Sequence, residues 1–363
     1  TQIRIGSLSL QLSELESSVV GAQLGSQAIA SSLKAGAIGL AIVMVFMIVM
    51  YAVPGIAASL ALAIYTTLVI ATLYLFDITL TLPGIAGIIL GIGMAVDANV
   101  IVFARIREEI ATGKSVQTSM KIGFQKAMSA ILDGNITTLI ASVVLMALGS
   151  GTVKGFASTL AIGIIVSLFT SLVITRWVLK AFYAMGLKDK KFYGSKKERK
   201  PINFVGKRAI FFVISIVVIV VGLAGLGVNK NKTGNPLNYS LEFMGGTSTN
   251  VTFNEDYSIE EIDEKVKPVV QEVTGDANIQ ATKVSGSNQV IIKTRELSLD
   301  ERTELSQKLN EKFGVDESLI QAESISSTVS NEMRRDAVVA VIVATIFMLL
   351  YIWFRFKDIR FAS

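Results

Sequence analysis

Seven blocks of apolar residues, separated by polar segments, dominate the pattern of the sequence. An α-helix needs about 20 mostly apolar residues to cross a bilayer, and all of the blocks except the short fourth one come close to that length. The pattern therefore predicts an α-helical polytopic membrane protein with about seven spans. The expected spans lie near residues 35–53, 56–76, 83–104, 135–148, 156–179, 209–228 and 337–354.

A long polar segment, residues 229–333, separates the last two expected spans and shows the periodicities of a folded domain. Ser258 with Glu261, and Ser298 with Glu301, have the spacing of capping boxes that begin helices. Pro268 is expected to kink the first of these helices. The order β-α-β-β-α-β predicts an inserted α+β domain of the ferredoxin-like type. The expected elements are strands at 248–253, 279–284, 289–294 and 319–326 and helices at 258–273 and 298–313.

Lysine and arginine are distributed unevenly around the expected spans. Basic residues gather between the third and fourth spans, between the fifth and sixth, and just after the seventh. With alternating spans these regions share one face, which the positive-inside rule assigns to the cytoplasm. The polar domain then lies on the extracytoplasmic side. The lysine-rich segment 188–200 is interpreted as a cytoplasmic linker that is attracted to anionic lipid headgroups, and no nucleic-acid partner is expected.

Composition excludes several kinds of chemistry. The chain has no cysteine and no histidine, which removes disulfides, thiolate nucleophiles, imidazole bases and zinc sites built from these residues. We therefore expect no cofactor and no metal site. Any proton chemistry must use carboxylates, lysines, tyrosines or water.

Asp97 is an acidic residue deep in the third expected span. It lies about fourteen residues, or about 21 Å, into that helix. A charge at this depth costs at least about 2.5–3.5 kcal/mol on insertion scales. One interpretation is that Asp97 binds and releases a proton inside the helix bundle. The alternative is a neutral or hydrogen-bonded side chain that only fixes helix packing, with Asn99 or Asn135 as its partner.

Other residues in and near the spans have structural interpretations. Gly84, Gly87 and Gly91 recur at intervals of three and four residues and predict a face for close helix packing. Asp133 is interpreted as the N-cap of the fourth span, and Asp77 as a solvated residue at an outer span end. A solvated helix with local ion pairs is expected at Arg105, Arg107, Glu108 and Glu109.

Two aspartates in or near the spans also require an intramembrane aspartyl protease to be considered. Such an enzyme needs two facing aspartates, one of them within a Gly-x-Gly-Asp element. Here Gly93 is followed by Met94, so Asp97 comes too late, and Asp133 lies at an expected helix end. We therefore expect no enzymatic activity.

The sequence contains a weak internal repeat. Residues 19–59 and 324–363 align at an offset of about 304 positions, and each copy runs from the end of a polar domain into a span. Repeats of this kind are common in transporters, whose sites lie between the two halves. Five spans follow in the first copy and one in the second, so about four further spans are expected to be missing.

Five motifs resemble the SecD and SecF proteins of bacterial protein export. Residues 82–109 (LPGIAGIILGIGMAVDANVIVFARIREE), 131–138 (ILDGNITT) and 149–160 (GSGTVKGFASTL) resemble signatures of SecD. Residues 241–247 (LEFMGGT) and 351–356 (YIWFRF) resemble signatures of SecF. The chain is therefore similar to the fused SecDF-type proteins of the RND superfamily.

The resemblance implies a function and a set of site residues. Asp97 matches the proton-conducting aspartate of the family. Members use the proton gradient to assist late translocation of preproteins that emerge from the SecYEG translocon in the bacterial cytoplasmic membrane, with SecA as an indirect partner. The motifs also carry the residues expected to support Asp97, namely Asn99, Arg105, Asp133, Asn135, Thr137 and Thr138.

The resemblance also assigns domains. The first span of SecD, most of its large external domain and the later spans of SecF have no counterpart in the sequence, so a complete proton path cannot be assembled. A small-molecule exporter of the RND type and a non-transporting membrane scaffold remain alternative functions. The expected domains are 1–34 (end of the large SecD external domain and connecting helix), 35–181 (SecD-like bundle of five spans), 182–208 (basic cytoplasmic linker), 209–228 (first SecF-like span), 229–333 (ferredoxin-like external domain) and 334–363 (second SecF-like span).

Overall fold

The computed structural model describes residues 16–19, 22–194, 205–233, 236–237, 239–277, 279–284 and 286–356. The chain divides into two compact units. The α+β unit contains residues 1–24 and 199–334, and the helical unit contains residues 25–198 and 335–363. Residues 1–15 of the expected SecD-like segment, and residues 195–204 of the basic linker, lie outside the described residues.

Among the described residues, seven helical segments are long and apolar enough to cross a membrane, which confirms the predicted number of spans. The fifth span consists of two helices joined by a π-helical turn at Thr170–Ile174. The spans are formed by α1 (Ala22–Tyr51), α2 (Val53–Leu75), α3 (Leu82–Ala111), α4 (Val116–Leu148), α5 (Gly151–Phe169) with α6 (Thr175–Ala184), α7 (Arg208–Thr233) and α12 (Ser327–Phe356).

The fourth span, α4, is longer than the sequence pattern indicates. It begins at Val116, and the Ser115 Oγ atom accepts a hydrogen bond of 3.3 Å from the Thr118 backbone N–H. The interpretation of Asp133 as an N-cap was wrong, because Asp133 lies in the middle of this continuous helix. The first half of α4 is too polar to be recognised as part of a membrane span, but its apolar residues recur at helical spacing and form one buried face. The buried residues of that face are Val116, Met120, Phe124, Ala127 and Ile131.

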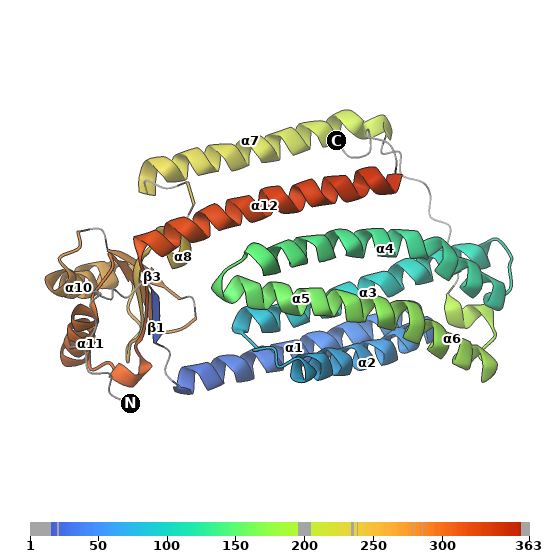
Figure 1. Cartoon of the computed structure of the whole chain (residues 1–363), viewed down its shortest axis with the longest axis horizontal. Helices are drawn as coiled ribbons and strands as arrows, with labels where there is room; N and C mark the ends of the chain where they lie inside the picture. Colours follow the sequence, from blue (N-terminus) through green and yellow to red (C-terminus); the bar gives the residue numbers. More distant parts are fainter. Residues whose placement is uncertain are drawn as a thin grey trace, which may run out of the picture. The chain divides into compact units, whose positions relative to one another are not determined.

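Within the helical unit, α3 packs against α5, α4 and α2 (Figure 1). Glycines let α3 approach α5 closely. A Cβ atom on Gly87 would lie 2.4 Å from Thr159 Oγ1 and 3.1 Å from the Phe156 carbonyl oxygen of α5, and one on Gly91 would lie 2.2 Å from the Tyr65 hydroxyl of α2. The predicted glycine face is therefore confirmed as a surface of close helix packing.

Gly123 makes a similarly close contact between α4 and α3. A Cβ atom there would lie 2.6 Å from Ile106 Cγ1 and 3.0 Å from the Ile106 backbone nitrogen. Because the backbone cannot rotate away, Gly123→Ala should lower the free energy of unfolding by about 1–3 kcal/mol, measured by denaturant titration in detergent micelles. Gly134→Ala is the matched control on the same helix, since its Cβ would meet nothing within 4 Å. Equal losses in both variants would contradict this interpretation.

The inserted domain has the predicted α+β fold. The strands β2 (Gly246–Thr252), β3 (Gln280–Lys283), β4 (Gln289–Thr294) and β5 (Gln321–Ile325) pair in the order β5-β2-β4-β3, and every pair is antiparallel. Both predicted capping boxes are present, at Ser258 and at Ser298. The first helix contains a π-helical turn just before Pro268. The helices are α9 (Ile259–Glu261), the π-helical turn Ile262–Val266, α10 (Lys267–Thr274) and α11 (Leu299–Phe313).

The core of this domain lies between the sheet and its two longer helices, α10 and α11, which cover the same face of the sheet (Figure 1). Alternate residues of β2 and β4, such as Val251 and Ile292, point into the core and are fully buried. Leu305 and Leu309 of α11 complete the core from the helical side. A small additional helix, α8 (Leu241–Met244), precedes β2.

A fifth strand, β1 (Glu16–Val19), extends this sheet and was not predicted from the sequence. It pairs antiparallel with β5, in a register that places Glu16 opposite Ile325 and Val19 opposite Ala322. Both strands precede a helix of 30 residues, α1 and α12 respectively. The two copies of the weak sequence repeat thus begin where these two paired strands end.

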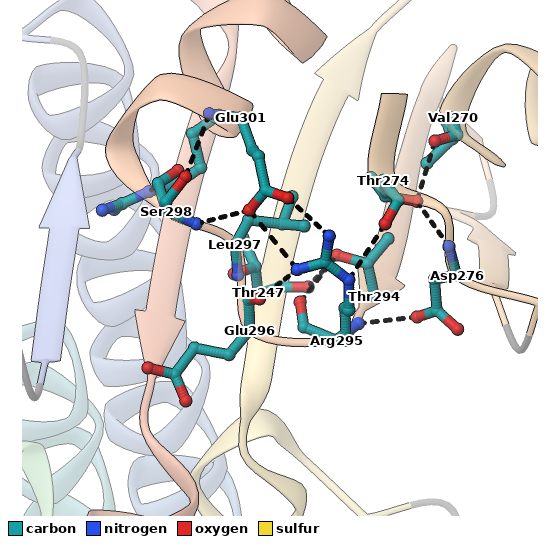
Figure 2. A network of polar contacts seen from close by, with 11 residues as sticks. Thr247, Val270, Thr274, Asp276, Thr294, Arg295, Glu296, Leu297, Ser298 and Glu301 are labelled. Atoms are coloured by element: carbon teal, nitrogen blue, oxygen red, sulfur yellow. Dashed lines mark hydrogen bonds and ion pairs between the residues drawn. The ribbon is translucent and has the colours of Figure 1, made fainter. Parts of the chain in front are cut away.

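Arg295 joins the end of β4 to the start of α11 (Figure 2). Its Nη2 atom donates to Glu301 Oε1 at 2.5 Å, its Nε atom donates to the Thr274 carbonyl oxygen at 2.9 Å, and its backbone N–H donates to Asp276 Oδ2 at 2.6 Å. The Arg295 side chain, together with the Ser298 backbone N–H, lowers the pKa of Glu301 to about 2. The charged carboxylate therefore stabilises the folded domain.

This network predicts a pH dependence of stability. Because the folded pKa of Glu301 lies below its ordinary value of 4.5, its contribution is complete above that value and is lost as the pH falls towards about 2. Glu301 and Arg295 are partly exposed, so the effect is moderate. We expect Glu301→Gln to lower the free energy of unfolding by about 1 kcal/mol at neutral pH and to change it little near pH 2. Denaturant titrations of both proteins across this range measure the difference. A constant difference at all pH values would contradict the prediction.

Candidate functional site

Asp97 lies in the second half of α3, at the depth that the sequence indicates. The helix begins after Thr81, whose Oγ1 atom accepts a hydrogen bond of 3.0 Å from the Gly84 N–H, and continues to Ala111. The structure places the Asp97 side chain on the exposed face of the helical unit, although the sequence led us to expect it inside the bundle. Leu90 and Gly93 continue this exposed face along α3, whereas the adjacent Ala98 is buried.

The proposed packing partners of Asp97 are engaged elsewhere. Asn99 is buried, its Nδ2 atom donates to the Ala95 carbonyl oxygen at 3.1 Å, and its Oδ1 atom has no partner among the described residues. Asn135 Nδ2 donates to the Ile131 carbonyl oxygen at 2.8 Å. Within the described part of the chain Asp97 itself forms no hydrogen bond and no ion pair. The geometry therefore does not support a purely local packing role for Asp97.

An exposed carboxylate at this depth has consequences in a bilayer. Direct contact with lipid tails is costly for a charged side chain, so intramembrane acids normally face a water-filled cavity or a polar partner. Gly93 lies one turn before Asp97 on the same face, and a Cβ atom there would meet nothing within 4 Å. Small residues of this kind let a second helix approach closely. The face of α3 around Asp97 can therefore receive a polar helix.

The two threonines expected to support Asp97 form hydrogen bonds to a backbone carbonyl of their own helix, α4. Thr137 Oγ1 and Thr138 Oγ1 both donate to the Gly134 carbonyl oxygen, at 2.8 Å and 3.1 Å. Both side chains are half-buried. Their hydroxyl protons are therefore satisfied within α4, and the structure does not bring them into contact with Asp97.

Asp133 of α4 binds residues of α12 in the helical unit. Its Oδ1 atom accepts hydrogen bonds of 2.8 Å from the Tyr351 hydroxyl and from Arg355 Nε, and its Oδ2 atom accepts one of 3.1 Å from Ser129 Oγ. Arg355 also donates to Ser129 Oγ. Sequence reasoning missed Tyr351 and Arg355, although both lie in the YIWFRF motif, because nothing in the sequence shows which helix that motif faces.

The packing of α12 on α4 continues along both helices. Val144 of α4 forms a buried cluster with Ala340 and Ala344 of α12. Small side chains bring the two helices close, and the Asp133–Arg355 ion pair fixes them near the end of α12. Asp133 thus links α4 to α12.

Ion pairs also fix the end of the bundle that is predicted to be cytoplasmic. Arg105 pairs with Glu108 at 2.6 Å, as expected for a solvated helix. Glu109 differs because it is buried and bridges two lysines, Lys114 and Lys126, the latter at 2.7 Å. Glu109 therefore stabilises the packing of α4 on α3. Only local ion pairs were predicted here from the sequence, and this tertiary contact was missed.

Arg107 holds the segment after α6 against the bundle. Its Nε atom donates to the Tyr193 carbonyl oxygen at 3.4 Å, its Nη2 atom donates to the Met50 carbonyl oxygen, and its guanidinium lies 4.3 Å from the centre of the Tyr51 ring. Tyr193 is fully buried, and burial raises the pKa of its hydroxyl to about 12. The short 3₁₀ helix Lys190–Tyr193 is thereby fixed to α3.

Comparison with known proteins decides the family. The family described as "Protein export membrane protein SecD/SecF, C-terminal" matches residues 6–184 and 305–363. The chain belongs to the SecD/SecF family. Protein translocase subunit SecD of Synechocystis sp. is 54% identical over 178 residues, which are 49% of this chain and 38% of that protein. Protein translocase subunit SecDF of Bacillus subtilis is 32% identical over 380 positions, covering 98% of this chain and 49% of that protein.

A solved structure of the SecD/SecF family has the same fold. The crystal structure of SecDF, a translocon-associated membrane protein from Thermus thermophilus, matches with a TM-score of 0.83 and 30% identity, covering 98% of this chain and 47% of that one. This match and the family assignment confirm the predicted resemblance to fused SecDF-type proteins. The chain spans about half the length of the SecDF relatives that it matches.

Proposed function

We propose that this chain acts in the Sec translocase as an accessory subunit of the bacterial cytoplasmic membrane, where it uses the proton gradient to assist late steps of preprotein translocation. Its SecD-like and SecF-like parts align over 98% of the chain with SecDF of Bacillus subtilis, which is named a protein translocase subunit. The partners in this proposal are the SecYEG translocon, the emerging preprotein and, indirectly, SecA.

The exposed carboxylate of Asp97 carries this proposal. An ionisable group on the open face of a spanning helix changes the affinity of that face for a polar partner when it gains or loses a proton. One charge that crosses about 100 mV is worth about 2.3 kcal/mol, which shifts a two-state equilibrium about fifty-fold. This is enough to move a domain between two positions, but not to unfold a folded substrate.

The contacts of α3 and α4 provide a route for such a change. α3 packs on α5 through its glycine face, so a movement of α3 displaces both helices. α4 packs on α3 and holds α12 through Asp133 and Arg355. α12 follows β5 of the inserted domain directly in the sequence. The helices that respond to Asp97 are thus covalently continuous with the domain that would contact the preprotein.

Orientation in the membrane is part of the proposal and has a direct test. The chain contains no cysteine, so a single introduced thiol reports on one position. Lys188→Cys should react with a membrane-impermeant maleimide only from the cytoplasmic side, and Glu260→Cys only from the outer side, because the basic segments favour the cytoplasm. Labelling of intact cells and of inverted vesicles measures both. The reverse pattern would contradict the orientation.

A chimera tests the function. This chain would replace the matched half of Bacillus subtilis SecDF in cells that lack the native protein. We expect the chimera to restore secretion of a preprotein and to lose this effect when an uncoupler collapses the proton gradient. Stimulation that persists without a gradient would contradict the proposal. A chimera that assembles but does not stimulate export would favour a scaffold role.

A further inference from the structure

A cavity of about 750 Å³ opens at the predicted cytoplasmic end of the helical unit, between the first turns of α4 and the helix α6. This volume is within the range of sites that hold small ligands. Its walls combine cationic side chains with apolar and aromatic ones. The residues used in the argument are Met120, Lys121 and Phe124 of α4 and Arg176, Lys180 and Tyr183 of α6.

Three cations line this cavity, and the described residues of its lining include no acidic side chain. Among the described residues, Lys121, Arg176 and Lys180 form no ion pair and no hydrogen bond. The guanidinium of Arg176 lies 5.8 Å from the centre of the Phe124 ring, and no carboxylate contributes to the lining. Lys114 and Lys126 differ, since both form ion pairs with Glu109. The cavity is therefore a concentrated positive site that favours an anion.

The start of α4 adds to this preference. The cavity includes Gln117 and Thr118 in the first turn of this 33-residue helix. The N-terminus of a helix carries a partial positive charge and favours phosphate groups. Arg176 can bind two phosphate oxygens at once, whereas Lys121 and Lys180 act as point charges.

Both tryptophans of the chain are exposed near the ends of spanning helices. Trp177 follows Arg176 directly and is 63% exposed, and Trp353 lies two residues before Arg355 and is 50% exposed. Tryptophan is enriched at the level of the lipid headgroups. Arg176 and Lys180 of the cavity flank Trp177 on α6, and this neighbourhood favours a headgroup over a solute of bulk water as the ligand.

We propose that this cavity binds the headgroup of an anionic phospholipid, with its phosphate held by Lys121, Arg176 and Lys180. Basic pockets between helices on the cytoplasmic side are known to hold such headgroups. Met120, Phe124 and Tyr183 supply the apolar surface on which the glycerol part of the lipid rests. The bound lipid bridges α4, which carries Asp133, and α6, which follows the π-helical turn.

Native mass spectrometry of the intact chain tests the proposal, with phosphatidylglycerol and phosphatidylcholine as probes. We expect phosphatidylglycerol to be retained and phosphatidylcholine to be lost. Arg176→Gln combined with Lys180→Gln should weaken the binding of phosphatidylglycerol about tenfold or more. Lys190→Gln combined with Lys191→Gln removes the same charge from residues outside the cavity and should leave binding unchanged. Equal retention of the two lipids, or equal losses in the two variants, would overturn the proposal.

Two further arms complete the test. Lys121→Gln changes a single exposed side chain on α4 and should still reduce the binding of phosphatidylglycerol several-fold, even if the double variant on α6 proves unstable. Inorganic phosphate added at millimolar concentration should not displace the lipid. Displacement by inorganic phosphate would overturn the assignment to a lipid and identify a site for a free phosphate. If Lys121→Gln binds phosphatidylglycerol with unchanged affinity, α4 does not contribute to the site, and the proposal is overturned.

Discussion

Asp97→Asn should abolish the stimulation of export by the proton gradient in the SecDF chimera. Asparagine keeps the shape and the hydrogen-bonding capacity of the side chain but cannot ionise. The expected result is the loss of the whole gradient-dependent increment in preprotein transport into inverted membrane vesicles. Insertion and assembly should be unaffected, because Asp97 makes no hydrogen bond or ion pair in the described part of the chain that the substitution could break.

Two variants control this experiment. Asp97→Glu remains ionisable and should retain part of the stimulation. Asp77→Asn makes the same chemical change at an exposed position between α2 and α3, where φ is +51°, a conformation that asparagine tolerates. It should behave like the unsubstituted chain. Normal export in Asp97→Asn under a proton gradient would show that the ionisation of Asp97 is dispensable.

Arg355→Met should loosen α12 from α4. The substitution removes the ion pair of 2.8 Å and leaves the carboxylate of Asp133 with the Tyr351 and Ser129 hydroxyls as its partners. Arg355 is 42% exposed and Asp133 is 20% exposed, so removing Arg355 leaves a partly buried carboxylate without its cation, at a smaller cost than in a fully buried pair. We expect the midpoint of thermal unfolding in lipid vesicles to fall by about 2–4 °C.

A matched control and a double variant show whether the loss of the Asp133–Arg355 ion pair causes the fall in the unfolding midpoint. Arg208→Met removes an exposed arginine at the start of α7 and should leave the midpoint almost unchanged. Asp133→Asn combined with Arg355→Met removes both charges and should be less destabilised than the sum of the single variants, since neither charge is left alone. Strict additivity of the two single effects would contradict the ion pair.

Much of the fold could be predicted because the relevant signals are local. The apolar blocks of the sequence correspond to spans, and the capping boxes at Ser258 and Ser298 begin the helices of the inserted domain where expected. β1 was missed, because pairing with β5 is a contact between distant parts of the chain that a short segment cannot reveal. The start of α4 was missed because one half of this helix is amphipathic rather than uniformly apolar.

At the candidate site, too, local features could be predicted from the sequence and tertiary contacts could not. The depth of Asp97 in its span follows from counting residues along α3, and its exposure does not, because exposure depends on which faces of α3 meet α4 and α5. Asp133 was interpreted from the sequence as an N-cap, which was wrong because it lies in the middle of α4. Its partners, Tyr351 and Arg355, are more than 200 residues away, at |i−j| of 218 and 222. Tertiary partners of this kind require a structure.

Infrared difference spectroscopy of the chain in lipid vesicles, with aspartate isotopically labelled, tests the proposal that Asp97 binds and releases a proton. A change of pH should convert a carboxylic acid band into a carboxylate band, and this pair of signals should be absent from Asp97→Asn and present in Asp77→Asn. Identical difference spectra for the unsubstituted chain and Asp97→Asn would show that Asp97 neither binds nor releases a proton, which would contradict the proposed role.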